Sequence, residues 1–224
     1  MVHSDIRDVI ADDLSDSVSY TKLYLRPHQF LARENESQPA IYRILEGWAH
    51  RFRLLPDGRR QVTRLFLPGD YCEMEWAQNG RSREPIVALT NLRALRIECD
   101  DLLYALSKDH ELEMKIWSKI VSSSYQLSEW ITNLGRKTAL ERLSYLFCEI
   151  FERLRTINLT YDDQFVMPLT QTDLADITGL TSVHVNRTLK QMREKGLIEL
   201  QSKWLRIVDM PELRKVALFQ PEGR

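Results

Sequence analysis

The stretch TQTDLADITGLTSVHVNRTLKQMREKGLIELQSKWLR, residues 170–206, predicts a helix, a tight turn, a second helix and a β-hairpin. Thr170 can cap the first helix, and Asp173, three residues later, can complete a capping box. Gly179 follows the first helix. Because glycine adopts a left-handed backbone conformation at little cost, the tight turn is expected there.

The second predicted helix is capped by Thr181 or Ser182 and runs to about Lys195. Its apolar residues recur at steps of four and three, which indicates a buried stripe made of Val185, Leu189 and Met192. Residues on the other faces can point outward together, and they are Ser182, Val183, Asn186, Arg187 and Lys190.

The small residues Ala175 and Gly179 let the two helices cross closely at a sharp angle, which is the geometry of a helix-turn-helix. An ordinary pair of packed helices is the alternative. The DNA-binding interpretation is favoured because Leu180 can fill the corner between the helices. A short hairpin carrying Lys203 and Arg206 then follows, as expected for a winged helix-turn-helix.

The composition is that of a globular protein, with 224 residues, 43% hydrophobic and 28% charged residues. The net charge is −1, but residues 170–206 carry six basic residues against four acidic ones. Specific DNA binding requires a local positive face of this kind, not a basic protein as a whole. No apolar run reaches the length of a membrane span, and the start of the chain lacks the pattern of a secretion signal. We therefore expect a cytoplasmic protein without a membrane partner.

Three cysteines, Cys72, Cys99 and Cys148, lie far apart and form no C-x-x-C pair. This spacing argues against a disulfide framework, a zinc site or a sequence-local iron–sulfur site, and buried hydrophobic roles are expected instead. The sequence contains no P-loop, no G-x-S-x-G and no histidine–cysteine metal spacing. We expect no catalytic residues, no metal and no cofactor.

An N-terminal region, residues 1–107, combines short alternating segments with turn signals from about Tyr24 to Ile97. Such a pattern predicts a small antiparallel barrel or jelly roll, so the chain as a whole is expected to be an α+β protein. A C-terminal region, residues 136–224, contains a strongly apolar helix at 138–154 and the winged helix-turn-helix.

A long helix is predicted between these regions, over residues 108–135. Its apolar residues form a narrow stripe at steps mostly of three, four or seven, and they are Leu112, Ile116, Ile120, Leu127, Ile131 and Leu134. A narrow apolar stripe on a long helix is typical of a two-stranded coiled coil, which makes these residues a candidate dimer interface. The alternative is a helix that packs on the core of its own domain, and one helix can do both.

The order of barrel, long helix and winged helix-turn-helix resembles the Crp/Fnr family of bacterial transcription regulators, whose cyclic AMP receptor has a cyclic-nucleotide-binding β-roll. The similarity is carried by IYRILEGWAHRFRLLPDGRRQVTRLFLPGDYCEM (41–74), GRKTALERLSYLF (135–147) and PLTQTDLADITGLTSVHVNRTLKQMREKGLIE (168–199). The resemblance implies a homodimer that places two recognition helices in successive major grooves of a pseudo-palindromic operator. It also implies RNA polymerase as a candidate partner.

Residue by residue, the resemblance assigns base contacts to Ser182, Val183 and Arg187, and Asn186 is a further candidate. Arg187 can donate two hydrogen bonds to guanine, whereas Val183 can only touch a thymine methyl group. Candidate phosphate contacts, which position a protein without reading sequence, are Thr170, Thr172, Thr181, His184, Lys190 and Lys203.

In relatives that bind cyclic AMP, a Gly-Glu pair and an Arg-Ser pair hold the ribose and the phosphate. The first pair is Glu73-Met74 in this sequence, and the second is Ser82-Arg83 or, after a shift of one residue, Arg83-Glu84. A carboxylate at Glu73 repels a phosphate, so no response to cyclic AMP is expected. The alternative is a regulator whose barrel must bind another small molecule, or a haem held by His28, His50 or Cys72, before it binds DNA.

Overall fold

The computed structural model describes residues 18–37, 39–72 and 80–220. The chain divides into two compact units, residues 1–126 and residues 127–224. Residues 1–17 lie outside the described residues. So does the pair Glu73-Met74, which the sequence analysis aligned with the first ligand pair of the cyclic-AMP-binding relatives.

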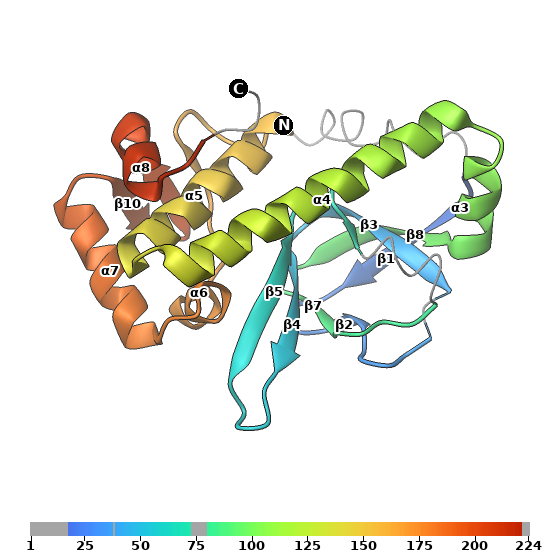
Figure 1. The fold of residues 1–224 in the computed structure, drawn as a ribbon, viewed down its shortest axis with the longest axis horizontal. Helices are drawn as coiled ribbons and strands as arrows, with labels where there is room; N and C mark the ends of the chain where they lie inside the picture. Colours follow the sequence, from blue (N-terminus) through green and yellow to red (C-terminus); the bar gives the residue numbers. More distant parts are fainter. Residues whose placement is uncertain (1–17, 38, 73–79, 221–224) are drawn as a thin grey trace. The chain divides into compact units, whose positions relative to one another are not determined.

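The N-terminal unit contains two four-stranded antiparallel sheets (Figure 1). One sheet has the order β1 (Tyr20–Leu25), β8 (Leu92–Glu98), β3 (Ala40–Glu46) and β6 (Tyr71–Cys72). The other has the order β2 (Phe30–Ala32), β7 (Ile86–Ala88), β4 (Ala49–Leu54) and β5 (Arg60–Phe66). The described strands therefore confirm the predicted antiparallel β-roll.

Two glycine turns connect these strands where the sequence predicted turns. Gly47 has φ +83°, and a Cβ atom there would lie 2.1 Å from the main-chain oxygen of Asn91, so no other residue fits. Gly69 has φ +92°, and the carboxylate of Asp70 accepts a hydrogen bond from the main-chain N–H of Leu67 at 2.7 Å. Both turns close tightly because glycine tolerates the left-handed region.

Side chains from both sheets form one apolar core, which includes Ile41 and Ile44 from β3, Phe66 from β5 and Ile86 from β7. Helix α3 (Cys99–Leu106) adds Leu102 to this core. The core is thus filled by side chains in the described part of the barrel.

Helix α4 (His110–Arg136) is the predicted long helix, and it extends from the first unit into the second. Leu112 and Ile116 are only 3% and 4% exposed and belong to the core of the N-terminal unit. These two residues of the candidate dimer interface therefore pack on the core of their own unit, which is the alternative that the sequence left open for this helix. The spacing of apolar residues along a helix is the same whether the apolar stripe packs on its own domain or against a second chain, so the spacing alone does not distinguish the two.

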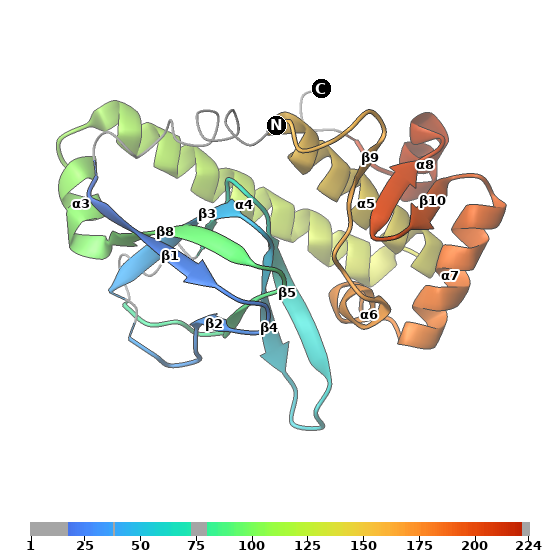
Figure 2. The same ribbon diagram turned by 180° about the vertical axis from the view of Figure 1, so that it is seen from behind.

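The C-terminal unit contains α5 (Ala139–Thr156), α6 (Gln171–Thr178), α7 (Ser182–Glu194) and α8 (Met210–Ala217). Its sheet has the order β10 (Ile198–Gln201), β11 (Trp204–Ile207) and β9 (Gln164–Val166). Figure 2 labels β9 and β10 beside the helices of this unit. The wing is therefore three-stranded. The sequence predicted only a hairpin, because three residues of β9 inside a polar connection carry too short a pattern to be recognised.

Helix α5 is N-capped by Thr138, whose side chain forms a reciprocal capping box with Glu141. One face of α5 is buried, with Leu143, Phe147 and Ile150 completely or almost completely inaccessible. A hydrogen bond joins α4 to α5: the indole N–H of Trp130 donates to the carboxylate of Glu149 at 2.8 Å. Helix α5 also contacts both α6 and α7.

Candidate DNA-binding site

Helix α6 begins with the predicted capping box. The hydroxyl oxygen of Thr170 accepts from the N–H of Asp173 at 3.1 Å, and the Asp173 carboxylate accepts from the N–H of Thr170 at 2.9 Å. The Thr170 hydroxyl also donates to this carboxylate at 2.6 Å. Its proton is thus already used inside the protein, which limits what Thr170 can offer a phosphate.

The corner between α6 and α7 is formed by Gly179, which has φ +67°. The N–H of Leu180 donates to the carbonyl of Ala175 at 3.1 Å, and Leu180 is half-buried in the corner. The structure therefore has the glycine turn and the corner leucine that the sequence predicts.

Helix α7 is the second helix of the motif and starts at the N-cap Thr181, whose hydroxyl oxygen accepts from the N–H of His184 at 3.2 Å. The predicted stripe of Val185, Leu189 and Met192 is buried. Since the apolar stripe fixes the rotation of the helix, the remaining faces must point to solvent.

The residues predicted to contact bases all lie on the exposed side of α7, and they are Ser182, Val183, Asn186 and Arg187. Val183 is 82% exposed, so its apolar side chain is available for contact from outside. Arg187 forms no hydrogen bond or ion pair with any residue that the structure describes. An uncommitted guanidinium beside an exposed apolar group can meet the edges of bases in a major groove.

The candidate phosphate contacts differ in accessibility. Thr172, Thr181, Lys190 and Lys203 are exposed, as is Thr170, while His184 is half-buried. Lys190 lies 3.7 Å from the carboxylate of Glu194, a weak pair between exposed groups that solvent screens. All six positions lie on α6, α7 or the wing, but the half-buried His184 is the least available of them.

Lys203 lies in the turn between β10 and β11. Ser202 and Lys203 have φ +49° and +67°, the left-handed conformations that a two-residue hairpin turn requires. The carbonyl of Lys203 accepts from the N–H of Met167 at 2.7 Å, which ties this turn to β9. The Lys203 side chain is thereby held at the exposed tip of the wing.

Gln171 is a residue of this site that the sequence analysis missed. Its side-chain oxygen accepts a hydrogen bond from the amide of Asn186 at 3.2 Å. The two residues are 15 positions apart, and only the crossing of α6 and α7 brings them together. No periodicity in the sequence signals such a contact.

The remaining dimer candidates lie on the exposed surface of α4. Ile120, Leu127 and Ile131 are 37%, 42% and 74% exposed, and Leu134 is half-buried. Leu127 and Ile131 are therefore large apolar side chains that one copy of α4 leaves exposed to solvent.

In the N-terminal unit, the residues aligned with the second ligand pair are engaged within the protein. The hydroxyl of buried Ser82 donates to the main-chain oxygen of Glu84 at 2.6 Å. The Glu84 carboxylate lies 3.0 Å from Arg51 Nε and 2.7 Å from Arg53 Nη2, and it accepts from the Thr63 hydroxyl at 2.6 Å. Glu84 thus supplies a buried negative charge next to two arginines.

The candidate haem ligands occupy separate places. His28 is exposed in the turn between β1 and β2, His50 is buried in β4 against the ring of Phe52, and Cys72 is buried in β6. Among the residues that the structure describes, no three histidine, cysteine or acidic side chains form a group that could hold a metal ion. Burial raises the pKa of the Cys148 thiol to about 12, so this thiol stays protonated at neutral pH.

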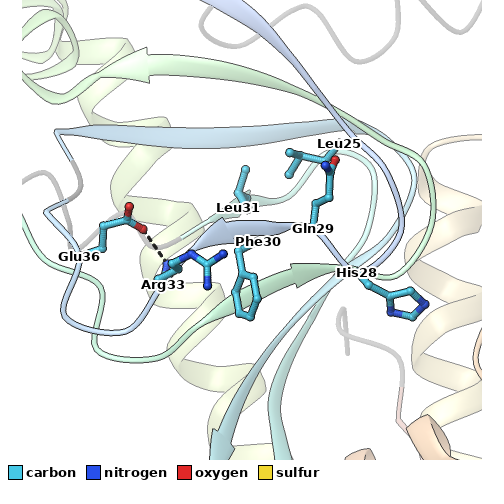
Figure 3. Close-up of a pocket in the computed structure, with 7 residues that line it drawn as sticks. All are labelled: Leu25, His28, Gln29, Phe30, Leu31, Arg33 and Glu36. Carbon is cyan, nitrogen blue, oxygen red and sulfur yellow. Dashed lines mark hydrogen bonds between the residues drawn. The ribbon is translucent and has the colours of Figure 1, made fainter.

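A hollow of about 460 Å³ lies at one end of the barrel (Figure 3). Its lining comes from the end of β1, the following turn and β2, and includes His28, Gln29, Phe30 and Arg33. The guanidinium of Arg33 lies 4.2 Å from the centre of the Phe30 ring, and Glu36 accepts from the main-chain N–H of Arg33 at 3.0 Å. The hollow is open to solvent, and Leu31 of the apolar core forms part of its lining.

Comparisons with known proteins match both units. A model of the Crp-like helix-turn-helix domain matches residues 141–216, and a model of the cyclic nucleotide-binding domain matches residues 22–109. The nitrogen fixation regulation protein FixK of Azorhizobium caulinodans is 31% identical over 162 residues. This match covers 72% of the present chain and 64% of FixK, so the chain spans less than two thirds of that relative.

Two further comparisons extend over more of the chain. The transcriptional activator protein FnrL of Cereibacter sphaeroides is 25% identical over 191 residues, which are 84% of this chain and 76% of FnrL. The structure of FixK2 from Bradyrhizobium japonicum has a TM-score of 0.80 at 24% identity, covering 89% of this chain and 98% of that one. The latter likeness shows that the two chains share a fold.

A winged helix-turn-helix with an exposed second helix, in one chain with a barrel of the cyclic nucleotide-binding type, defines a DNA-binding transcription regulator. The chain belongs to the Crp/Fnr family of such regulators. No helix among the described residues is both long and apolar enough to cross a membrane.

Proposed function

We propose that this protein binds one pseudo-palindromic DNA sequence as a homodimer and regulates transcription from it, without acting as an enzyme. The observation that carries the proposal is the outward face of α7, where Arg187 is exposed and uncommitted to any described residue. A guanidinium that has no protein partner and lies on the second helix of the motif suits guanine O6 and N7. The chromosome is in the cytoplasm of a bacterial cell, and this is the proposed location.

The dimer is supported by the exposed apolar residues of α4. We call Ile120, Leu127, Ile131 and Leu134 the α4 stripe; their numbers follow steps of seven, four and three. Such steps place them on one side of a helix, and two copies of the stripe can bury each other in a two-stranded coiled coil. A dimer of this kind matches the two-fold symmetry of a palindromic operator.

Independence from cyclic nucleotides is supported by the contacts of Glu84. Its carboxylate forms ion pairs with Arg51 and Arg53, the kind of contact that a phosphate would make with them. The same negative charge would repel the phosphate of an incoming nucleotide. The hydroxyl of Ser82 is likewise committed to the main chain. We therefore propose that DNA binding occurs without a cyclic nucleotide.

The relatives indicate the kind of regulation. FixK is named as a regulator of nitrogen fixation, and FnrL and the AadR of Rhodopseudomonas palustris are named as activators of transcription. By analogy, we propose that this chain also acts on transcription initiation, with RNA polymerase as its partner once it is bound to DNA.

The test is selection of binding sites from random DNA by the purified, ligand-free and metal-free protein at a stated salt concentration. Enrichment of a palindromic sequence by a dimeric protein is the expected result. If a folded dimer enriches nothing until a cyclic nucleotide is added, independence from cyclic nucleotides is wrong. If the folded protein enriches nothing under either condition, sequence-specific binding by the protein as isolated is wrong.

A further inference from the structure

The contact between Gln171 and Asn186 joins the first and second helices of the helix-turn-helix on their exposed side. Asn186 Nδ2 donates to Gln171 Oε1 at 3.2 Å, and both residues are exposed. Neither amide is needed to hold the helices together, because Val185, Leu189 and Met192 already bury the apolar stripe of α7. The contact therefore asks for an explanation other than stability.

Gln171 is well placed to orient a neighbour because its own backbone is fixed. It is the first residue of α6, directly after Thr170, and the capping box between Thr170 and Asp173 fixes the helix start. Asn186 is equally fixed, since it follows the buried Val185 on α7. Only the side-chain torsions of the two amides remain free, and the hydrogen bond restricts them.

The hydrogen bond also determines which groups Asn186 presents to DNA. A primary amide has two N–H donors and one oxygen acceptor. One donor is used by Gln171, so the second N–H and Oδ1 remain available. Adenine offers N7 as an acceptor and N6–H as a donor in the major groove, the pattern that asparagine reads with one N–H and its oxygen.

We propose that Gln171 is a specificity-determining residue, which positions the Asn186 amide to read adenine at one base pair of each half-site. The inference rests on the proposed function, because it requires α7 to lie in a major groove. Gln171 acts through Asn186 and need not touch a base itself. Without Gln171, the amide rotates freely and presents its oxygen or its nitrogen to either base, so the preference is lost while the helix still docks.

The experiment measures binding of the wild-type protein, Gln171→Ala, Asn186→Ala and the double variant to an operator found by selection. Every base pair of one half-site is replaced in turn, and the affinity is measured for each DNA. Wild type should prefer adenine at one position by roughly tenfold or more. Asn186→Ala should abolish this preference, and Gln171→Ala should reduce it to about threefold or less.

The double variant and a conservative variant separate orientation from a structural effect. Because Gln171 acts through Asn186, the double variant should equal Asn186→Ala at that base pair. Gln171→Glu keeps an acceptor for the Asn186 N–H, so it should retain the preference although its negative charge weakens binding to all sequences alike. Thermal unfolding of all variants should match wild type, as both side chains are exposed.

The outcomes distinguish this inference from the proposed function. The inference alone is overturned if the wild-type protein selects an operator but Gln171→Ala keeps the full preference at the base pair that Asn186 reads. A preference lost at a different base pair, or additive effects in the double variant, also overturns it. A wild-type protein that selects no sequence overturns the proposed function first.

Discussion

Arg142 Nη1, on α5, donates to the main-chain carbonyl oxygen of Thr178, in the last turn of α6, at 3.1 Å. The same guanidinium donates through Nε to the carbonyl oxygen of Lys137 at 2.9 Å. The last carbonyls of a helix have no partner within the helix, so Arg142 satisfies one of them. One side chain thereby ties the end of α6 to the segment that precedes α5.

Replacing Arg142 by methionine should lower the free energy of unfolding of the C-terminal unit by about 2–3 kcal/mol, because two hydrogen bonds from a charged donor are lost. Chemical denaturation measures the loss, and hydrogen exchange of the α6 amides localises it. Arg155→Met is the matched control on the same helix. The Arg155 side chain is largely exposed, and among the described residues it pairs with Glu152 alone, so its loss should cost less than about 1 kcal/mol. Equal effects of both changes would contradict the tie between α5 and α6.

Arg187→Ala should weaken binding to the selected operator by about 1–3 kcal/mol and relax the preference at one base pair, since a bidentate contact to guanine is removed. Titration of operators that differ at single base pairs measures both effects. Arg193→Ala removes the same charge from the last turn of α7. This control should leave the base preferences unchanged, and a specificity change that is equal in the two variants would refute base reading by Arg187.

Lys203→Ala should weaken binding to all DNA sequences to a similar extent, because the wing tip carries a charge but no sequence information. The slope of affinity against salt concentration should fall by about one counterion. Lys203→Gly is a second variant that also removes the charge but suits the left-handed φ of +67° at this position. Both variants should bind DNA equally weakly, and a loss confined to one operator would argue against a phosphate contact.

Leu127→Asp combined with Ile131→Asp should shift the protein from dimer to monomer, because two charges in each copy would enter a buried apolar interface. Sedimentation equilibrium at several concentrations measures the shift. Val121→Asp is the control, since Val121 is also exposed on α4, at 65%, but lies outside the α4 stripe. Dissociation by Val121→Asp with no effect of the double change would place the interface on another face of α4.

Glu84→Gln should lower the free energy of unfolding of the N-terminal unit by roughly 2 kcal/mol, because the partly buried guanidinium of Arg51 loses a charged partner. Glu46→Gln removes an acidic partner of Arg93 at an exposed site and should cost less than about 1 kcal/mol. Denaturant titration of both variants measures the difference. If the two changes cost the same, the buried ionic cluster around Glu84 does not stabilise the barrel.

The helix-turn-helix and much of the barrel could be predicted from the amino-acid sequence, because the signals there are local. The capping pair Thr170 and Asp173, the left-handed Gly179 and the buried stripe of α7 each depend on residues a few positions apart. Local hydrogen bonds and helix periodicity act over such distances, so the sequence pattern predicts which face of α7 points outward.

Contacts between residues that are distant in the sequence could be seen in the folded structure alone. Leu112 and Ile116 pack in the core of the N-terminal unit. The carboxylate of Glu84 forms ion pairs with Arg51 and Arg53. Gln171 accepts a hydrogen bond from Asn186. The spacing of apolar residues indicates that one face of a helix is buried, but it does not indicate which element covers that face. The sequence around an amide or carboxylate likewise does not indicate its hydrogen-bond partner. These contacts form only when strands pair and helices cross. The orientation of the Asn186 amide therefore could not be predicted from the sequence.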